Sequence, residues 1–332
     1  MPTKGGNFAA RLDELKLALN DYLQAEKSDG RTLQFTKIFL SDAQNQYQRL
    51  VESELFQDIV AKVPQTIVEQ PPLSGTKIAM LVKTSDQPRD FIFQSLRLTA
   101  EEARLGNSYL QTMMLFEKYL KGMSERGLDI KTHCVRTWIY VTGIDINYQG
   151  VVKARNDIFR KCGLTIDTHF IASTGIGGAS QVREACVAMD FLTYPDIKEE
   201  QKKYLQALDH LNPTHEYGVA FERGTRLQLD GLQRLFISGT ASIDRFGHVI
   251  YLGDVEKQTE RLLENIEALL RDGEATLDNI KYFIIYLRDI SDYHTVDRYM
   301  AARFPDKPRI LLYAKVCRPE WLIEMECIAE KQ

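Results

Sequence analysis

The sequence predicts an α+β fold built from tandem copies of one unit. The order helix–strand–helix–strand–strand occurs three times along the 332 residues. Within each copy, the expected helices carry apolar residues at helical spacing, and the expected strands alternate apolar and polar side chains. The second and third copies also open with a strand hairpin, which gives the full unit the form β-β-α-β-α-β-β. In the second copy 91–98 is the clear strand of this hairpin, and 76–85 is the candidate for the other.

The first copy, expected over residues 1–85, is degenerate and incomplete, because no opening hairpin precedes its first helix. Its expected helices and strands are 8–23, 32–42, 43–60, 65–72 and 76–85. The second copy is expected over residues 86–193. Its elements are 91–98, 107–130, 132–145, 147–163, 168–175 and 182–192.

A polar connector is expected over residues 194–216, with a helical stretch at 197–211. The third copy follows over 217–332 and is the clearest of the three. Its elements are the hairpin 221–253, the helices 255–280 and 291–304, and the strands 281–290, 308–316 and 323–329.

An aspartate and a tyrosine follow the equivalent strand in every copy. The pairs are Asp42 and Tyr47, Asp145 and Tyr148, and Asp289 and Tyr293. Because aspartate is a preferred helix N-cap, we expect these aspartates to cap the second helix of each unit while the tyrosines pack beneath it. The pairs mark the repeat and are not expected to do chemistry.

Composition excludes several classes of function. The 42 basic and 46 acidic residues give a net charge of −4, which offers no basic surface for nucleic acid. No apolar run reaches the roughly 18 residues of a membrane span, and the N-terminus has no apolar signal core. The five cysteines form no CxxC pair, so we expect free thiols in the cytoplasm. The six histidines are dispersed, so no metal site is expected.

The two closing strands carry an unusual set of polar residues. Alternation places Arg309, Tyr313, Lys315 and Cys317 on one face of the first strand, and Glu324 and Glu326 on one face of the second. Lysine and glutamate are almost never buried unless they are paired. We therefore expect this polar face, Glu324 included, to line a cleft between repeats and to bind a ligand, while Glu326 balances Lys315. The alternative is a set of solvated edge residues or a structural salt bridge.

The segments "FISGTAS", "NIKYFIIYLRDISDY", "PRILLYAKV" and "IEMECIA" resemble the Rid (YjgF) superfamily, small trimeric proteins with a chorismate-mutase-like fold and ligand sites between subunits. With "THFIASTGIGG" and "CRPEWLIEMECIA", the full chain is similar to the chorismatases, tandem Rid-like enzymes that hydrolyse chorismate. In a Rid trimer the face opposite the helices is buried between subunits. The resemblance therefore implies an intramolecular pseudo-trimer. We favour a monomer, although the incomplete first copy leaves a homo-oligomer open.

The resemblance also implies a reaction: cleavage of the enolpyruvyl ether of chorismate to pyruvate and either a hydroxybenzoate or a dihydroxycyclohexadiene carboxylate. Glu324 would protonate the ether's methylene, and Arg309 would hold a carboxylate of this dicarboxylate substrate, without metal or organic cofactor. The equivalent places in the first two copies, near Ala79 and near Ser173, lack this pair, so one working cleft is expected.

Further substrate contacts are expected from Tyr313, Lys315, Cys317, Tyr217, Arg223, Ser238 and Gly175. Gly175 lies in "STGIGG", whose backbone N–H groups suit a carboxylate, although a plain turn between strands explains it equally well. Phe221 stands where family members often have a tyrosine, with Tyr217 just upstream. Within the chorismatase resemblance, a cysteine at position 317 is similar to the hydroxybenzoate-forming members; the alternative is that Cys317 is simply a small buried hydrophobic residue.

Two other functions remain open at this point. An imine deaminase, the activity of small Rid proteins, would use the same arginine and glutamate, but it needs only one repeat per chain. A non-catalytic protein that binds small carboxylates and has inherited the fold is the other alternative, because fold alone does not give function.

Overall fold

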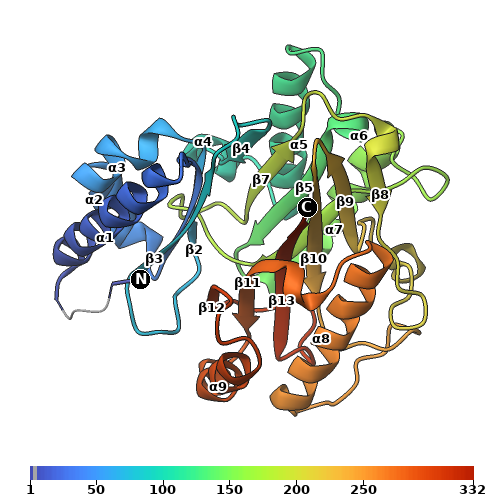
Figure 1. Cartoon of the computed structure of the whole chain (residues 1–332). Coiled ribbons are helices and arrows are strands. Elements are labelled where there is room, and N and C mark those ends of the chain that lie inside the picture. The colour runs from blue at the N-terminus through green and yellow to red at the C-terminus, as the bar shows by residue number, and fades with distance from the viewer. Residues whose placement is uncertain (3–5) are drawn as a thin grey trace.

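The computed structural model describes residues 1–2 and 6–332, except for the side chain of Tyr217. It confirms the α+β class with three sheets, and helices pack against each of them (Figure 1). The N-terminal sheet has the strand order β2 (Gln65–Glu69), β1 (Thr32–Leu40), β3 (Ile78–Ser85). The central sheet has the order β4 (Ile92–Leu96), β7 (Val187–Thr193), β5 (Cys134–Val141), β6 (Ala172–Gly177).

The C-terminal sheet has six strands. Their order is β12 (Arg309–Tyr313), β11 (Ile280–Leu287), β13 (Ile323–Lys331), β10 (Leu232–Thr240), β9 (Gly224–Leu229), β8 (Lys202–Tyr204). The α-helices are α1 (Phe8–Ser28), α2 (Ala43–Val51), α3 (Glu54–Asp58), α4 (Ala100–Arg104), α5 (Ser108–Ser124), α6 (Ile130–His133), α7 (Ile144–Lys161), α8 (Val255–Asp272) and α9 (Tyr293–Arg303).

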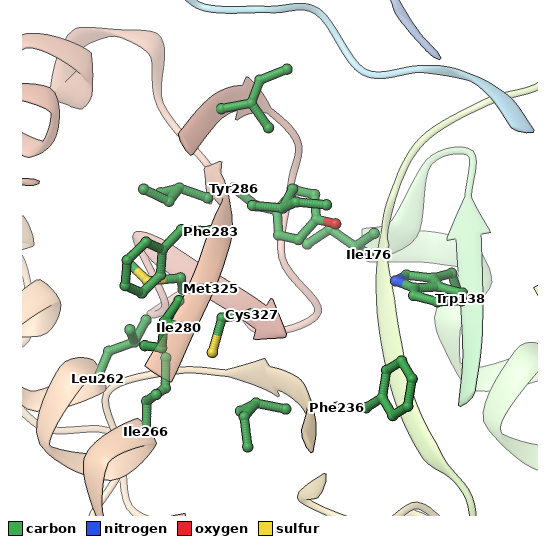
Figure 2. Close-up of a cluster of buried hydrophobic side chains, with 14 of the residues drawn as sticks. Trp138, Ile176, Phe236, Leu262, Ile266, Ile280, Phe283, Tyr286, Met325 and Cys327 are labelled. Carbon is green, nitrogen blue, oxygen red and sulfur yellow. The ribbon is translucent and has the colours of Figure 1, made fainter. Parts of the chain in front are cut away.

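The helices form where capping residues and apolar stripes coincide. Asn7, Asn107 and Asp254 cap α1, α5 and α8 by accepting a hydrogen bond from the backbone two or three positions into each helix. Helix α8 buries Leu262, Ile266 and Leu269 at helical spacing. In Figure 2 Leu262 and Ile266 lie near Ile280, Phe283 and Met325, whereas Tyr286 extends toward Trp138 and Ile176 of the central sheet.

Each sheet repeats the same pairing. A long strand pairs in parallel with the strand that follows its second helix and antiparallel with the closing strand: β1 with β2 and β3, β5 with β6 and β7, β11 with β12 and β13. The shared register defines equivalent positions. Three sets matter below: Lys37, Trp138 and Ile284; Ala79, Ala188 and Glu324; Leu81, Asp190 and Glu326.

The segments that follow β2, β6 and β12 join the three sheets in a closed ring. The Glu69 amide donates to the Ala179 carbonyl at 2.8 Å, and the Gly177 amide donates to the Lys315 carbonyl at 2.8 Å. The Tyr313 amide closes the ring by donating to the Pro71 carbonyl, also at 2.8 Å. This ring of backbone bonds gives the chain the pseudo-trimeric arrangement that the sequence predicts.

Three local expectations are wrong. The stretch 197–211 is not helical, because Lys202–Tyr204 pairs with the edge of β9 and extends the sheet. The expected helix 43–60 is split into α2 and α3, since Ser53 starts a new helix by capping Phe56. Asp42 does cap α2, but Gly143 holds the cap position of α7, which leaves the Asp145 side chain available for other partners.

Candidate functional site

Glu324 lies on β13, on the face of the C-terminal sheet that meets the central sheet. Its paired neighbour across β11 is Tyr286, and its side chain is only 4% exposed. A Cβ at Gly239 of β10 would collide with Oε1 of Glu324 and lie 3.1 Å from the Thr174 methyl group. Only glycine therefore leaves room for the carboxyl group where β10, β13 and β6 meet.

The Glu324 carboxyl accepts no hydrogen bond from any residue in the part of the chain that the structure describes. Burial and the neighbouring negative charge of Glu326 raise its pKa to about 8, although the positive charges of Arg136 and Arg223 oppose that rise. Glu324 is therefore mostly protonated at neutral pH. A carboxyl group in this state is suited to general acid catalysis.

Glu326, two residues further along β13, has the opposite environment. Arg136 Nη2 and Trp138 Nε1 each donate to its carboxylate at 2.8 Å, and the Thr174 hydroxyl donates at 2.5 Å. All three donors come from the central sheet. The expectation that Glu326 balances Lys315 is wrong, because its partners are buried and Lys315 is exposed.

Cys317 and Tyr148 lie beside Glu324. Burial raises the pKa of Cys317 to about 12, with the charge of Glu324 as a second cause, and the Tyr148 hydroxyl opposes that rise by donating a hydrogen bond to the sulfur. The Tyr148 ring covers Gly175, where an added Cβ would lie 2.9 Å from it. Gly175 therefore provides close approach for an aromatic ring, and the thiol stays protonated at neutral pH.

Two arginines lie close to the Phe221 ring. The guanidinium carbons of Arg155 and Arg223 each lie 5.6 Å from the Phe221 ring centre. Arg223 Nη2 donates to the Asn212 carbonyl at 3.0 Å, and its charge acts on Glu324. Arg155 is only 1% exposed, and within the described residues its Nε and Nη2 are buried without a hydrogen-bond partner. Buried donors are normally satisfied, so Arg155 has donors available for an anion.

Helix α7 positions Tyr148 and Arg155, because residues seven apart lie on one face of a helix. The sequence analysis assigned Tyr148 only to packing and missed Arg155. A signal for Arg155 exists, since it lies within the buried stripe formed by Val151, Ala154 and Ile158. An arginine inside an apolar stripe must be buried, and it needs an anionic or aromatic partner.

Arg309 and Tyr313 do not lie with Glu324, which corrects the expected cleft. Arg309 pairs across the sheet with Phe283 and Tyr313 with Leu287, whereas Glu324 pairs with Tyr286. Paired residues share a face and neighbours along a strand alternate, so Arg309 and Tyr313 point to the opposite face. Arg309 Nε donates to Asp297 of α9 at 3.3 Å.

The other residues expected to contact substrate are Lys315, Ser238 and Tyr217, and each has a different environment. Lys315 Nζ is 3.0 Å from Asp145 of α7, and its side chain is 48% exposed. The Ser238 hydroxyl is buried, accepts from the Ser173 amide at 2.9 Å and donates to the Glu222 carbonyl at 2.6 Å. Ser238 therefore joins β6 to β10 and has its donor in use. The side chain of Tyr217 lies outside the described residues.

Two surface hollows lie away from Glu324. One, of about 810 Å³, is lined by residues of α5 and α7 such as Tyr109 and Lys153. The other, of about 440 Å³, is lined by Glu69, Arg183 and their neighbours. Among the described residues, no three His, Cys, Asp or Glu side chains gather as a metal ion would require. None of the described helices is both long and apolar enough to cross a bilayer.

Sequence comparisons match the C-terminal unit of the chain, and a structural comparison matches nearly the whole fold. Residues 228–331 match the family model for Endoribonuclease L-PSP. A RutC family protein from Pyrococcus abyssi (strain GE5 / Orsay) is 32% identical over 100 residues, which are 30% of this chain and 79% of that protein. A crystal structure of a chorismatase covers 90% of this chain and 93% of its own, with a TM-score of 0.69 and 23% identity. At that identity the likeness shows the fold alone.

Proposed function

Because the chain belongs to the RutC family and shares the fold of a chorismatase, we propose that it is an enzyme that cleaves the enolpyruvyl ether of chorismate. The observation that carries this proposal is Glu324. It is a buried carboxyl group with a pKa of about 8, and no described residue donates a hydrogen bond that would stabilise its ionised form. Hydrolysis of an enol ether starts with protonation of carbon, which requires an acid of this kind.

The charges around Glu324 suit a dianion. Chorismate carries a ring carboxylate and an enolpyruvyl carboxylate, and the guanidinium carbons of Arg155 and Arg223 both lie 5.6 Å from the Phe221 ring centre. Guanidinium binds carboxylate through two parallel hydrogen bonds. Arg155 has buried donors to offer, so we assign it the role of carboxylate anchor in place of Arg309. Arg223 adds positive charge on the side that faces Glu324.

The proposed reaction uses one proton and one water. Glu324 gives its proton to the terminal methylene carbon, and the carbon–carbon π electrons form the new C–H bond. The oxocarbenium ion that results is captured by water, whose released proton returns to the Glu324 carboxylate. The hemiketal then collapses: its hydroxyl proton passes to the ether oxygen, the hydroxyl oxygen forms the pyruvyl C=O, and the bond between the pyruvyl carbon and the ether oxygen breaks, which releases pyruvate and a ring alcohol. Loss of one further water from the dihydroxycyclohexadiene carboxylate gives a hydroxybenzoate.

Cys317 and Tyr148 border the acid on the side of α7. A protonated thiol is small and apolar, so Cys317 is assigned to shaping the wall against the ring. This role bears on whether the ring product keeps both hydroxyl groups or loses water.

The test is incubation with chorismate, with pyruvate detected by coupled lactate dehydrogenase and the ring product identified by chromatography and mass. Catalytic release of pyruvate supports the proposal, and the mass of the ring product decides between the two product classes. Ammonia from 2-aminoacrylate, without pyruvate from chorismate, would instead identify an imine deaminase. Thermal stabilisation by chorismate without turnover would identify a binding protein.

A further inference from the structure

Glu326 is the point at which all three sheets meet. It belongs to β13 of the C-terminal sheet, and its carboxylate is bound by Arg136, Trp138 and Thr174 of the central sheet. Lys37 of β1, in the N-terminal sheet, brings its Nζ to 4.0 Å from Glu326 Oε1. Both oxygens of Glu326 therefore have partners, and the orientation of the carboxylate is fixed from two other units.

Lys37 is buried at 4% exposure in an aromatic enclosure. Its Nζ lies 5.0 Å from the ring centre of Trp138 and 5.3 Å from that of Tyr140, distances at which cation–π attraction operates. Burial lowers its pKa, whereas the charges of Glu326 and Asp190 raise it and those of Arg136 and Arg97 lower it further. Asp190 accepts from Arg97 and Tyr140, each at 2.9 Å, whereas Glu326 is the carboxylate whose oxygen lies at ion-pair distance from Lys37, 4.0 Å from its Nζ.

The shared strand register allows Lys37 to be compared with the residues at the same position in the other two sheets. The equivalent residues are Trp138 and Ile284, so the cation enters from one sheet only. The N-terminal sheet has no counterpart of Glu324, because Ala79 holds that place. A buried lysine is costly to a fold, and here it is placed next to the carboxylate that adjoins the acid.

We propose that Glu326 is a positioning residue, fixed by the other two units so that its negative charge lies beside Glu324, and that Lys37 sets how much of that charge Glu324 experiences. The two units that lack the acid thereby control its protonation. This inference rests on the proposed role of Glu324 as the general acid. The test therefore measures the titration of Glu324 itself and does not depend on turnover of chorismate.

The experiment is a titration of the Glu324 carboxyl by ¹³C NMR on the full chain, with Glu324→Gln used to assign the signal. Removal of the neighbouring negative charge in Glu326→Gln should lower the Glu324 titration midpoint by about one pH unit or more, because like charges disfavour ionisation. Loss of the cation in Lys37→Met should move the midpoint in the opposite direction. The cations whose charge acts on Glu324, Arg136 and Arg223, are retained in both variants.

Lys83→Met is the matched control. Lys83 is also a lysine of the N-terminal sheet and is partly buried, but the charges around it are Arg234, Glu330 and Asp90. It should leave the Glu324 midpoint unchanged. Equal midpoints in wild type, Glu326→Gln and Lys37→Met would overturn the proposal, as would shifts of the same sign in both variants. Opposite shifts in a protein that does not turn over chorismate would uphold the electrostatic inference and reject only the proposed reaction.

Discussion

Two glutamates, two positions apart on β13, differ in what surrounds them. Glu326 has three hydrogen-bond donors and a nearby lysine, whereas Glu324 faces Gly239, Thr174 and Cys317 without a hydrogen bond from a described residue. The pKa of Glu324 rises to about 8 because it is buried next to a carboxylate. The pair has the arrangement in which one carboxyl group keeps its proton and its neighbour holds negative charge.

Glu324→Gln should abolish most turnover and leave binding intact. Glutamine keeps the shape of the side chain but cannot deliver a proton to carbon. General acid catalysis contributes about 10²–10⁴-fold, so kcat for pyruvate release should fall by at least that factor. In the wild type, kcat should also fall as pH rises through about 8, where Glu324 ionises. A pH-independent kcat from pH 6 to 9, or a fully active Gln variant, would contradict the assignment.

The same substitution should stabilise the protein at alkaline pH. The folded-state pKa of Glu324 is about 8 and the ordinary value is 4.5, so the folded protein holds one proton more than the unfolded chain between these limits. Stability then falls by about 1.4 kcal/mol per pH unit across that window. Glu324→Gln removes this loss, so its Tm advantage over wild type should grow from pH 5 to pH 8. Parallel Tm profiles would show that the pKa is not raised.

Arg155→Met should raise KM without destabilising the fold. The variant loses a carboxylate anchor, and charge-assisted hydrogen bonds are worth about 1.5–3 kcal/mol, so KM should rise roughly 10–100-fold. Two buried donors without a described partner are removed at the same time, so Tm should stay level or increase. Arg160→Met on the same helix, an exposed arginine paired with Asp157, is the control and should change neither.

The sequence predicted the place of a side chain correctly where one regular strand determines which way the side chain points. It failed where the strand ends and the backbone turns, and where a contact joins distant parts of the chain. Glu324, Cys317 and Arg223 were singled out from the sequence, and the structure brings them together. Arg309 was assigned to the same face as Cys317 by counting alternate positions. The count fails because β12 ends at Tyr313, after which the chain turns away from strand geometry. The role of Arg155 depends on a contact with Phe221, 66 positions away, which no local pattern contains.

At the scale of elements, the site depends on how β6 meets the C-terminal sheet. β6 is an edge strand of the central sheet, and it is joined to its neighbours by Ser238, Thr174 and the ring of backbone bonds. Helices and strands with strong periodicity were predictable from the sequence. The strand Lys202–Tyr204 was not, because its polar residues form a strand only through pairing with β9.

Gly177→Ala should weaken this junction. An added Cβ would lie 2.7 Å from the Lys315 carbonyl oxygen and 2.9 Å from its amide nitrogen, and backbone atoms cannot rotate away. The resulting separation of β6 from the segment after β12 should cost about 1–3 kcal/mol of unfolding free energy, as overpacking typically does. Urea denaturation measures this. Gly122→Ala in α5, where the added group meets only the end of Gln94, should be neutral or stabilising.

At the scale of the whole molecule, three sheets of one chain take the places of three subunits. The N-terminal sheet has three strands and lacks the hairpin, yet its β2 segment completes the ring of backbone bonds. The prediction of a pseudo-trimer followed from counting repeats, which the sequence displays directly. Oligomeric state and ligand number remain predictions at this scale.

The chain should be a monomer with one ligand site. Light scattering should give a mass near 38.1 kDa that is independent of concentration, because the ring closes within the chain. Calorimetry with a chorismate analogue should give one ligand per chain, since Ala79 and Ala188 occupy the positions equivalent to Glu324. A stable trimer, or a stoichiometry of three, would contradict this.

Covalent fusion of the three units also removes a constraint of symmetry. In a trimer of identical chains, any residue near the threefold axis appears three times, so a glutamate at the position of Glu326 would bring three like charges together. Here the three equivalent positions hold Leu81, Asp190 and Glu326, and the neighbouring set holds Lys37, Trp138 and Ile284. A single polypeptide can therefore surround one acid with a lysine from one unit and an arginine from another, an asymmetric electrostatic environment that no exact threefold assembly can build.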